Sequence, residues 1–398
     1  MKTLIHGLVG GVVMGAAISG GIGAQDDPSV SQLNAMLPYV PSEFALIENG
    51  WAMIRFVDYE ALFESEGLTL FRALGSVDFL LNAVPLGAIL SRIAAGPEAL
   101  RYLFTSVGQM AEVVGFEWLL DVDQSLEFGD APAVGLLLGG EFNAVKIGTT
   151  LESRGFSSKD IQGVAVWHRF DDSAISIEAR DVADPFGGHL GAAARIALLP
   201  DAVGNARTWP LIEAIIAASE STQPSLADDP TYRALAEAVS QSDGLLIQAL
   251  LFSGTALRLA GDPAHTGEES KEDLDSLPPY SGAVLADRQE GDDQVALIGL
   301  VFADEATALS AAEVLVRRVE EFLPASSSGD VLVDRFGATV GIREVQQSED
   351  GLAIAVVEAR YPVPVERTDP ETGQYNMRGL LFSAWVQATL YREFTPLW

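Results

Sequence analysis

The chain has 398 residues, 48% of them apolar and 20% charged, which is the composition of a folded protein with a sizeable core. Its 24 basic and 56 acidic residues give a net charge of −32, which argues against nucleic-acid binding because that binding depends on cationic side chains. There is no cysteine, which excludes disulfides, iron–sulfur clusters, thiolate zinc sites and cysteine nucleophiles.

Residues 1–24 have the order of a secretory signal peptide. Lys2 precedes an uncharged, glycine-rich apolar run, and Ala24 is the last small residue before an acidic stretch. Cleavage near Ala24 would export the protein, making it periplasmic, secreted or bound at the cell surface. A retained N-terminal anchor helix is the alternative, because the run is about long enough to span a bilayer. Nothing later resembles a transmembrane span, so none is expected in the mature chain.

An N-terminal α+β domain is predicted at 37–260, after a polar linker at 25–36. It opens with a hairpin, because Asn49-Gly50 separates the apolar runs 44–48 and 51–56 and Asn-Gly favours a type I′ turn. The element that follows is a helix with Asp58 as its N-cap.

The rest of this domain contains two further predicted parts. Residues 68–115 form a helical segment that prolines and glycines interrupt. Residues 131–255 have the order strand, helix, strand, strand, strand, helix, and Asn143 is placed to cap the first helix. This order predicts a ferredoxin-like unit, an antiparallel sheet with helices on one face.

A second α+β domain is predicted at 280–398, after an acidic linker or loop at 261–279. Asp304 is a candidate cap for a long helix that follows a buried strand. This strand and helix repeat the pattern of the strand and helix on either side of Asn143. We therefore predict an internal duplication, with a pair of similar α+β units.

The C-terminus carries an apolar stripe. Phe382, Val386, Leu390, Phe394 and Trp398 are four residues apart, and Trp385 widens the stripe, so an amphipathic terminal helix is predicted. Such a helix either packs on the protein's own core or binds a partner or a membrane surface. In the second case Trp385, Phe394 and Trp398 are the candidate partner-binding residues.

Two segments resemble a recurring pattern of uncharacterised exported bacterial proteins. One is the run Gly140-Glu-Phe142, Leu151-Glu-Ser-Arg-Gly-Phe156 and Ile161-Gln-Gly-Val-Ala-Val-Trp167; the other is Pro224-Ser-Leu-Ala-Asp-Asp-Pro-Thr-Tyr-Arg-Ala-Leu235. The resemblance covers roughly residues 130–255 and implies strand–helix–strand units. It implies no catalytic residue, cofactor or substrate.

Metal-binding and histidine chemistry have few candidates. The carboxylates best placed for a hard cation are Asp121 and Asp123, and Asp287 and Asp292, but neither segment has the spacing of an EF-hand loop. The remaining histidines after signal cleavage, His168, His189 and His265, show no zinc-site spacing. Solvated turns and surface imidazoles explain these residues more simply, so no metal or cofactor is predicted.

No phosphate-binding loop, dinucleotide fingerprint or nucleophile elbow occurs in the sequence. The favoured hypothesis is an exported, non-enzymatic binding or scaffold protein of the cell envelope, with a protein or envelope partner. One alternative is a protein that binds an apolar, lipid-like small molecule between the helical segment and a sheet. The other is a hydrolase with carboxylates or scattered histidines, since a catalytic triad depends on geometry and not on sequence order.

Overall fold

The computed structural model describes residues 32–45, 53–69, 72, 90–100, 106, 108–240, 244–254, 277–324, 330–363 and 376–397. Several predictions lie outside these residues: the signal peptide, the Asn49-Gly50 turn, most of the helical segment 68–115, most of the linker 261–279, His265 and Trp398. From Ser31 onward the chain forms one compact unit.

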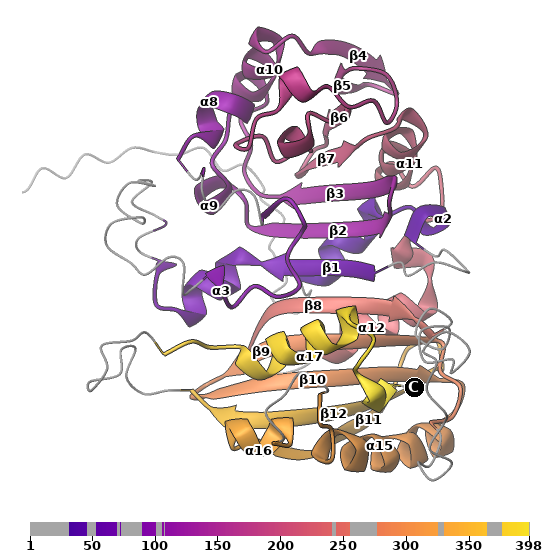
Figure 1. Cartoon of the computed structure of the whole chain (residues 1–398). Coiled ribbons are helices and arrows are strands. Elements are labelled where there is room, and N and C mark those ends of the chain that lie inside the picture. The colour runs from indigo at the N-terminus through magenta and orange to yellow at the C-terminus, as the bar shows by residue number, and fades with distance from the viewer. Residues whose placement is uncertain are drawn as a thin grey trace, which may run out of the picture. The chain divides into compact units, whose positions relative to one another are not determined.

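Twelve strands of the described residues form a single antiparallel sheet (Figure 1). Their order across the sheet is β11-β12-β10-β9-β8-β1-β2-β3-β7-β6-β5-β4. Their bounds are β1 Met53–Asp58, β2 Gln124–Asp130, β3 Ala133–Gly139, β4 Ser157–Ile161, β5 Val164–Arg169, β6 Ala194–Leu198, β7 Ala202–Ala206, β8 Leu245–Ser253, β9 Gly282–Glu290, β10 Asp293–Phe302, β11 Thr339–Gln347 and β12 Ala353–Pro362.

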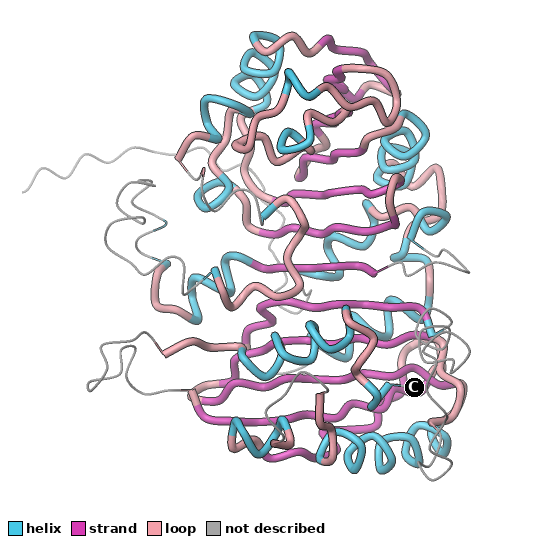
Figure 2. The backbone as a smooth tube through the Cα atoms, in the orientation of Figure 1, coloured by secondary structure: helices cyan, strands magenta, loops and turns pink. Residues whose placement is uncertain are grey.

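Helices connect and cover these strands (Figure 2). The α-helices are α1 Gln32–Met36, α2 Ser42–Ala45, α3 Tyr59–Ser65, α8 Met110–Val114, α9 Trp118–Asp121, α10 Ala144–Ser153, α11 Trp209–Ser219, α12 Pro230–Ser240, α15 Glu305–Glu320, α16 Leu332–Phe336 and α17 Leu380–Leu390. Short 3-10 helices are η1 Leu37–Tyr39, η2 Ile177–Ala179, η3 Gly188–Leu190, η4 Leu226–Asp228 and η5 Thr395–Leu397. The α+β class and the antiparallel sheet are thus as predicted. No helix among the described residues combines the length and apolarity that a membrane crossing requires.

Helices pack on both faces of the sheet, whereas the sequence predicted one covered face. Alternate residues of a strand point to opposite faces. On one face, here called the α12 face, α12 packs on side chains of β9 and β10 such as Val284 and Leu297, and α11 packs on β6 and β7. On the other, the α17 face, Leu285 and Ile298 pack under α15 and α17, and α10 packs beside β3 and β6. The first predicted unit is therefore not covered in the ferredoxin-like way, because α10 and α11 lie on opposite faces.

The two halves of the sheet repeat one connection. The β2–β3 hairpin is followed by α10, and the chain then returns so that β7 pairs with the free side of β3. The β9–β10 hairpin is followed by α15, and β12 then pairs with the free side of β10. This is the repetition that the sequence predicted. The halves meet where β1 pairs with β8.

The predicted domain boundary falls inside this sheet. The strands on either side of the predicted linker, β8 and β9, pair along their length from Leu245↔Gln289 to Ser253↔Gly282. The two predicted units therefore share one sheet.

Two local predictions differ from the structure. Phe44 and Ala45, predicted as the start of a hairpin strand, belong to the short helix α2, and β1 pairs with β2 and β8. The terminal helix ends at Leu390 because Arg392 adopts a φ of 60°, outside helical geometry.

Candidate functional site

The first pair of candidate metal ligands, Asp121 and Asp123, is already engaged within the protein. Asp121 ends α9, and its Oδ2 accepts a hydrogen bond from the Glu117 amide at 2.7 Å. Asp123 precedes β2, and its Oδ1 lies 2.6 Å from an Arg72 guanidinium nitrogen. These two carboxylates are held by internal donors, which favours a structural role over a cation site.

The second pair is divided between the core and the surface. Asp287 is buried on β9, while Asp292 is exposed in the turn before β10. Asp287 faces an arginine, which supplies the positive charge that a metal would otherwise provide. No group of three potential metal ligands occurs among the residues that the structure describes.

Two of the candidate partner-binding residues, Trp385 and Phe394, lie in the core, whereas Trp398 is outside the described residues. Trp385 of α17 and Phe394 beyond it are fully buried, and their rings are 5.6 Å apart. Phe394 also packs edge-on against Phe322, with 4.9 Å between ring centroids. The helix is therefore docked on the sheet, and a partner could reach these two residues only if α17 detached.

The two described histidines lie in different surroundings. His168 of β5 packs against the indole ring of Trp209, 5.0 Å between centroids, and burial together with Arg195 and Lys159 lowers its pKa. His189 lies in η3, where burial again lowers the pKa, opposed mainly by Glu98. Both imidazoles are thus biased toward the neutral form.

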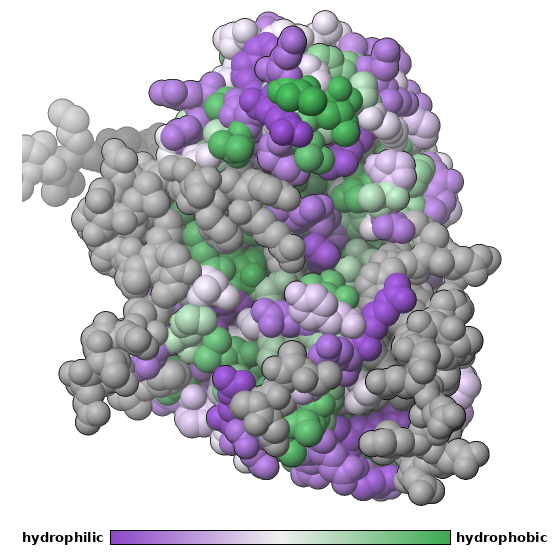
Figure 3. Space-filling model, in the orientation of Figure 1, coloured by the Kyte–Doolittle hydropathy of each residue, from purple (hydrophilic) through white to green (hydrophobic). Residues whose placement is uncertain are grey.

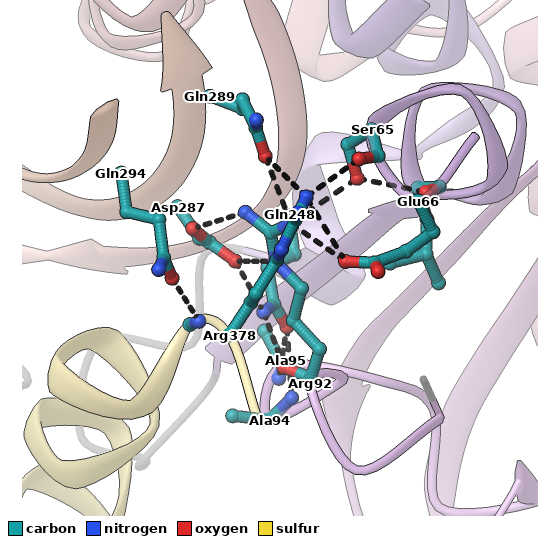
Figure 4. Close-up of polar contacts among 12 residues, drawn as sticks. Ser65, Glu66, Arg92, Ala94, Ala95, Gln248, Asp287, Gln289, Gln294 and Arg378 are labelled. Carbon is teal, nitrogen blue, oxygen red and sulfur yellow. Dashed lines mark hydrogen bonds and ion pairs between the residues drawn. The ribbon is translucent and has the colours of Figure 1, made fainter. Parts of the chain in front are cut away.

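A buried polar cluster lies around Gln248 of β8, Asp287 and Gln289 of β9 and Gln294 of β10 (Figure 4). At its centre Asp287 and Arg92 form a two-point ion pair. Nε of Arg92 donates to Oδ2 at 2.9 Å and Nη2 donates to Oδ1 at 3.0 Å. Each side chain is only 1% exposed.

Two further charged residues complete the cluster. Nη1 of Arg92 lies 3.4 Å from a Glu66 carboxylate oxygen, and a guanidinium nitrogen of Arg378 lies 3.8 Å from the same oxygen. Arg378 also donates to the Ser65 carbonyl at 2.7 Å. Two arginines thus face two carboxylates, so the formal charges balance, as burial of ions requires.

The side-chain amide of Gln248 ties the cluster to the main chain around Arg92. Its Oε1 accepts from the amides of Ala94 and Ala95 at 2.8 and 2.9 Å. Its Nε2 donates to the Arg92 carbonyl at 2.7 Å and to Asp287 at 3.1 Å. The Gln248 amide therefore accepts two hydrogen bonds and donates two, and the side chain is fully buried.

The cluster lies on the α17 face, between the apolar core under α3 and α10 and the apolar core under α15 and α17. Sequence reasoning named Asp287 alone from it, as a candidate cation ligand that a solvated turn would explain more simply, and the burial of Asp287 contradicts the solvated turn. Arg92 and Gln248 carry no local signal, because only the sheet brings residues so far apart together.

Another buried carboxylate, that of Asp58, lies at the start of α3. Asp58 caps this helix by accepting a hydrogen bond from the Ala61 amide at 2.8 Å, as the sequence predicted. Burial raises the pKa of Asp58 to about 7; the Ala61 amide opposes this, and Glu60 and Asp123 add to it. Asp58 is thus a proton-binding group near neutral pH.

The long connection from β5 to β6 exposes a set of apolar side chains. We call them the 170–182 loop surface: Phe170, Ile175, Ile177 and Val182, which are 38%, 60%, 72% and 52% exposed. In Figure 3 hydrophobic surface is visible near the top of the view, where Figure 1 places α10 and β4. In this connection Ile175 forms an isolated bridge with Ala192, and residues 177–179 form η2.

Two ion pairs hold this loop in place. Arg154 at the end of α10 donates to Asp181 and Asp184, at 3.0 Å each, and the Asp184 side chain is 1% exposed. Ser176 donates its amide to the Gly191 carbonyl at 2.8 Å, closing the loop on itself. Gly191 is required there, because a Cβ would lie 1.9 Å from the Ser176 carbonyl oxygen. The apolar side chains are therefore presented on a fixed backbone.

The fold and these sites define an α+β protein with one open antiparallel sheet. No protein-family model and no curated protein matches the chain. Among solved structures it is similar to TP0453. Crystal form I gives 8% identity and a TM-score of 0.35 over 89% of this chain and 96% of that one. Crystal form III of TP0453 gives 9% identity and a TM-score of 0.33, over 82% of this chain and 93% of that one. At these values the likeness assigns no function.

Proposed function

We propose that this protein is an exported, non-enzymatic binding or scaffold protein of the cell envelope, and that it contacts a partner protein through the 170–182 loop surface. The observation that carries the proposal is the exposure of three aliphatic side chains, Ile175, Ile177 and Val182, on one loop. Apolar surface left in water is unfavourable by about 25 cal/mol per Å². Exposed apolar patches are typical of sites where another protein binds.

The anchoring of the loop supports the same proposal. Arg154 fixes Asp181 and Asp184, so the loop backbone loses little further freedom when a partner binds. Export is supported by the charged, apolar and small-residue order of residues 1–24. The buried positions of Trp385 and Phe394 favour this surface over the terminal helix as the contact site.

The test compares complexes formed by the full-length protein in its own cells. The double variant I175S/I177S removes two of the exposed side chains, and V145S is a matched control because Val145 of α10 is 78% exposed. Native electrophoresis of detergent extracts should show wild type and V145S in the same larger complex and I175S/I177S as the free chain. An I175S/I177S protein that still migrates with the complex would contradict the proposal.

A further inference from the structure

The Asp287 carboxylate is aligned for a guanidinium group. Its two oxygens accept two parallel hydrogen bonds from Nε and Nη2 of Arg92, at 2.9 and 3.0 Å. A lysine ammonium is a point donor and cannot make both of these bonds at once. Nη1, on the other side of the guanidinium, donates to Ser65 Oγ at 3.1 Å and faces Glu66 at 3.4 Å. The guanidinium is thus bound from two sides.

Within the segment 92–95, Gln248 forms its hydrogen bonds with main-chain groups. It donates to the carbonyl of Arg92 and accepts from the amides two and three residues later. These three bonds form with any residues that follow the arginine in the same backbone conformation. Asp287 and Gln248 together bind an arginine side chain and the main chain of the residues that follow it. A simple ion pair would bind the side chain alone.

Close packing over the arginine side chain comes from Gly379. This residue has a φ of 68°, and a Cβ there would lie 2.8 Å from Arg92 Cγ and 3.0 Å from Asp287 Oδ2. Glycine is needed here because its backbone is left-handed and because a side chain would collide with Arg92 and Asp287. The groups around the arginine therefore come from α3, β8, β9 and the start of α17, none of which belongs to the segment 92–95 itself.

We propose that these groups form a receptor for an arginine-containing peptide, occupied in this structure by the chain's own residues 92–95. We call it the arginine receptor: Ser65, Glu66, Gln248, Asp287 and Gly379. The charge of −32 on the chain favours the approach of a cationic peptide. The receptor is distinct from the 170–182 loop surface, so its test does not depend on the proposed function.

The first test is chemical rescue of the full-length R92A variant. N-ethylguanidinium replaces the missing end of the side chain, and ethylammonium at equal concentration is the control ligand. At several times its dissociation constant, N-ethylguanidinium should raise the melting temperature of R92A by about 2–4 °C, and the rise should saturate. Wild type should show no rise, because Arg92 fills the site.

The matched control is R92A/D287N, which keeps the shape of the site and removes the carboxylate. N-ethylguanidinium should no longer raise the melting temperature of this double variant. Should R92A not fold by itself, refolding yield in the presence of each cation replaces the melting temperature. Equal effects of the two cations on R92A, or rescue that persists in R92A/D287N, would overturn the proposal.

The second test supplies the peptide from outside. A full-length variant with glycine at positions 92–95 is mixed with the capped peptide Ser-Arg-Ile-Ala-Ala-Gly, the sequence of residues 91–96. The same peptide with citrulline in place of arginine has the same shape without the charge. Binding or refolding at least about tenfold stronger with the arginine peptide is expected, since an unpaired buried carboxylate is costly. Equal responses to the two peptides would overturn the proposal.

Discussion

Arg92 and Asp287, 195 residues apart in the chain, form the most buried ion pair in the described part of the protein, each side chain being 1% exposed. The pair joins a segment of the N-terminal half to β9 of the C-terminal half. Removing one partner leaves the other charge buried and unpaired, which is far less favourable than removing both.

Asp287→Ala should therefore lower the free energy of unfolding by about 3–5 kcal/mol, because it leaves two buried arginines, Arg92 and Arg378, facing the single carboxylate of Glu66. The double variant R92A/D287A should lose less than the sum of the two single variants. Asp350→Ala is the control: its pair with Arg233 is 36–38% exposed and should contribute about 0–1 kcal/mol. Urea unfolding measures all four. Similar losses in D287A and D350A would contradict the buried role.

The positions that the sequence predicted correctly are those with local causes. Asn143 and Asp304 cap α10 and α15 as predicted, each through a hydrogen bond from a backbone amide three residues later. A cap is a contact within one turn of helix, and its residue type and spacing are therefore visible in the sequence.

The predictions that failed depend on contacts between distant segments. The apolar residues near Phe44 resembled a strand, but β2 and β8 occupy both sides of β1. The buried cluster was missed for the same reason. Arg92, Gln248 and Asp287 each look like ordinary polar residues until the order of the strands is known.

The stability of the protein should depend on Asp58 near neutral pH. Burial raises its pKa to about 7 in the folded protein, against 3.8 for an unperturbed group. The folded state therefore binds the proton more tightly, and stability falls as the pH rises from about 4 to about 7. Asp58→Asn keeps the helix cap and cannot ionise.

Asp58→Asn should leave the unfolding free energy unchanged near pH 4 and raise it at pH 8, by an amount on the order of a few kcal/mol. Urea unfolding at both pH values measures this. A variant whose advantage over wild type is the same at both pH values would show that Asp58 does not titrate in this range.

Glu290 should have the opposite pH dependence. Hydrogen bonds from Arg360 and Arg343 lower its pKa to about 2, against burial, which alone would raise it. Its contribution to stability is therefore complete above about pH 4.5 and is lost as the pH falls toward 2.

Glu290→Gln should reduce the unfolding free energy at pH 7 by about 1–3 kcal/mol and flatten the acid limb of the stability profile. Asp293→Asn is the control, because Asp293 contacts the same Arg360 but is 40% exposed. Thermal unfolding from pH 2 to 7 separates the two variants. An acid limb in E290Q as steep as in wild type would assign the acid sensitivity to other groups.

The export proposal is tested at the N-terminus. We expect the exported protein to begin at or near Gln25, because Ala24 is the last small residue before the acidic stretch. N-terminal sequencing of the exported fraction is the measurement. An N-terminus at Met1, or recovery of the protein only from membranes after a carbonate wash, would indicate the retained anchor helix.

Removing residues 380–398 tests the docking of α17. Leu381, Phe382, Trp385 and Val386 of this helix are buried, and so is Phe394 beyond it. Each large apolar side chain contributes about 1.5–3 kcal/mol when buried. Their combined loss consumes most or all of the usual stability of about 5–15 kcal/mol.

The truncated protein should therefore unfold, aggregate or be degraded, which near-ultraviolet circular dichroism and a thermal melt would detect. Tyr391→Ser is a suitable control, because Tyr391 follows the same helix but is 74% exposed and should tolerate the change. A truncated protein that melts like wild type and no longer associates with envelope material would contradict core docking. That result would return Trp385 and Phe394 to the role of partner-binding residues, on a helix that leaves the sheet to bind.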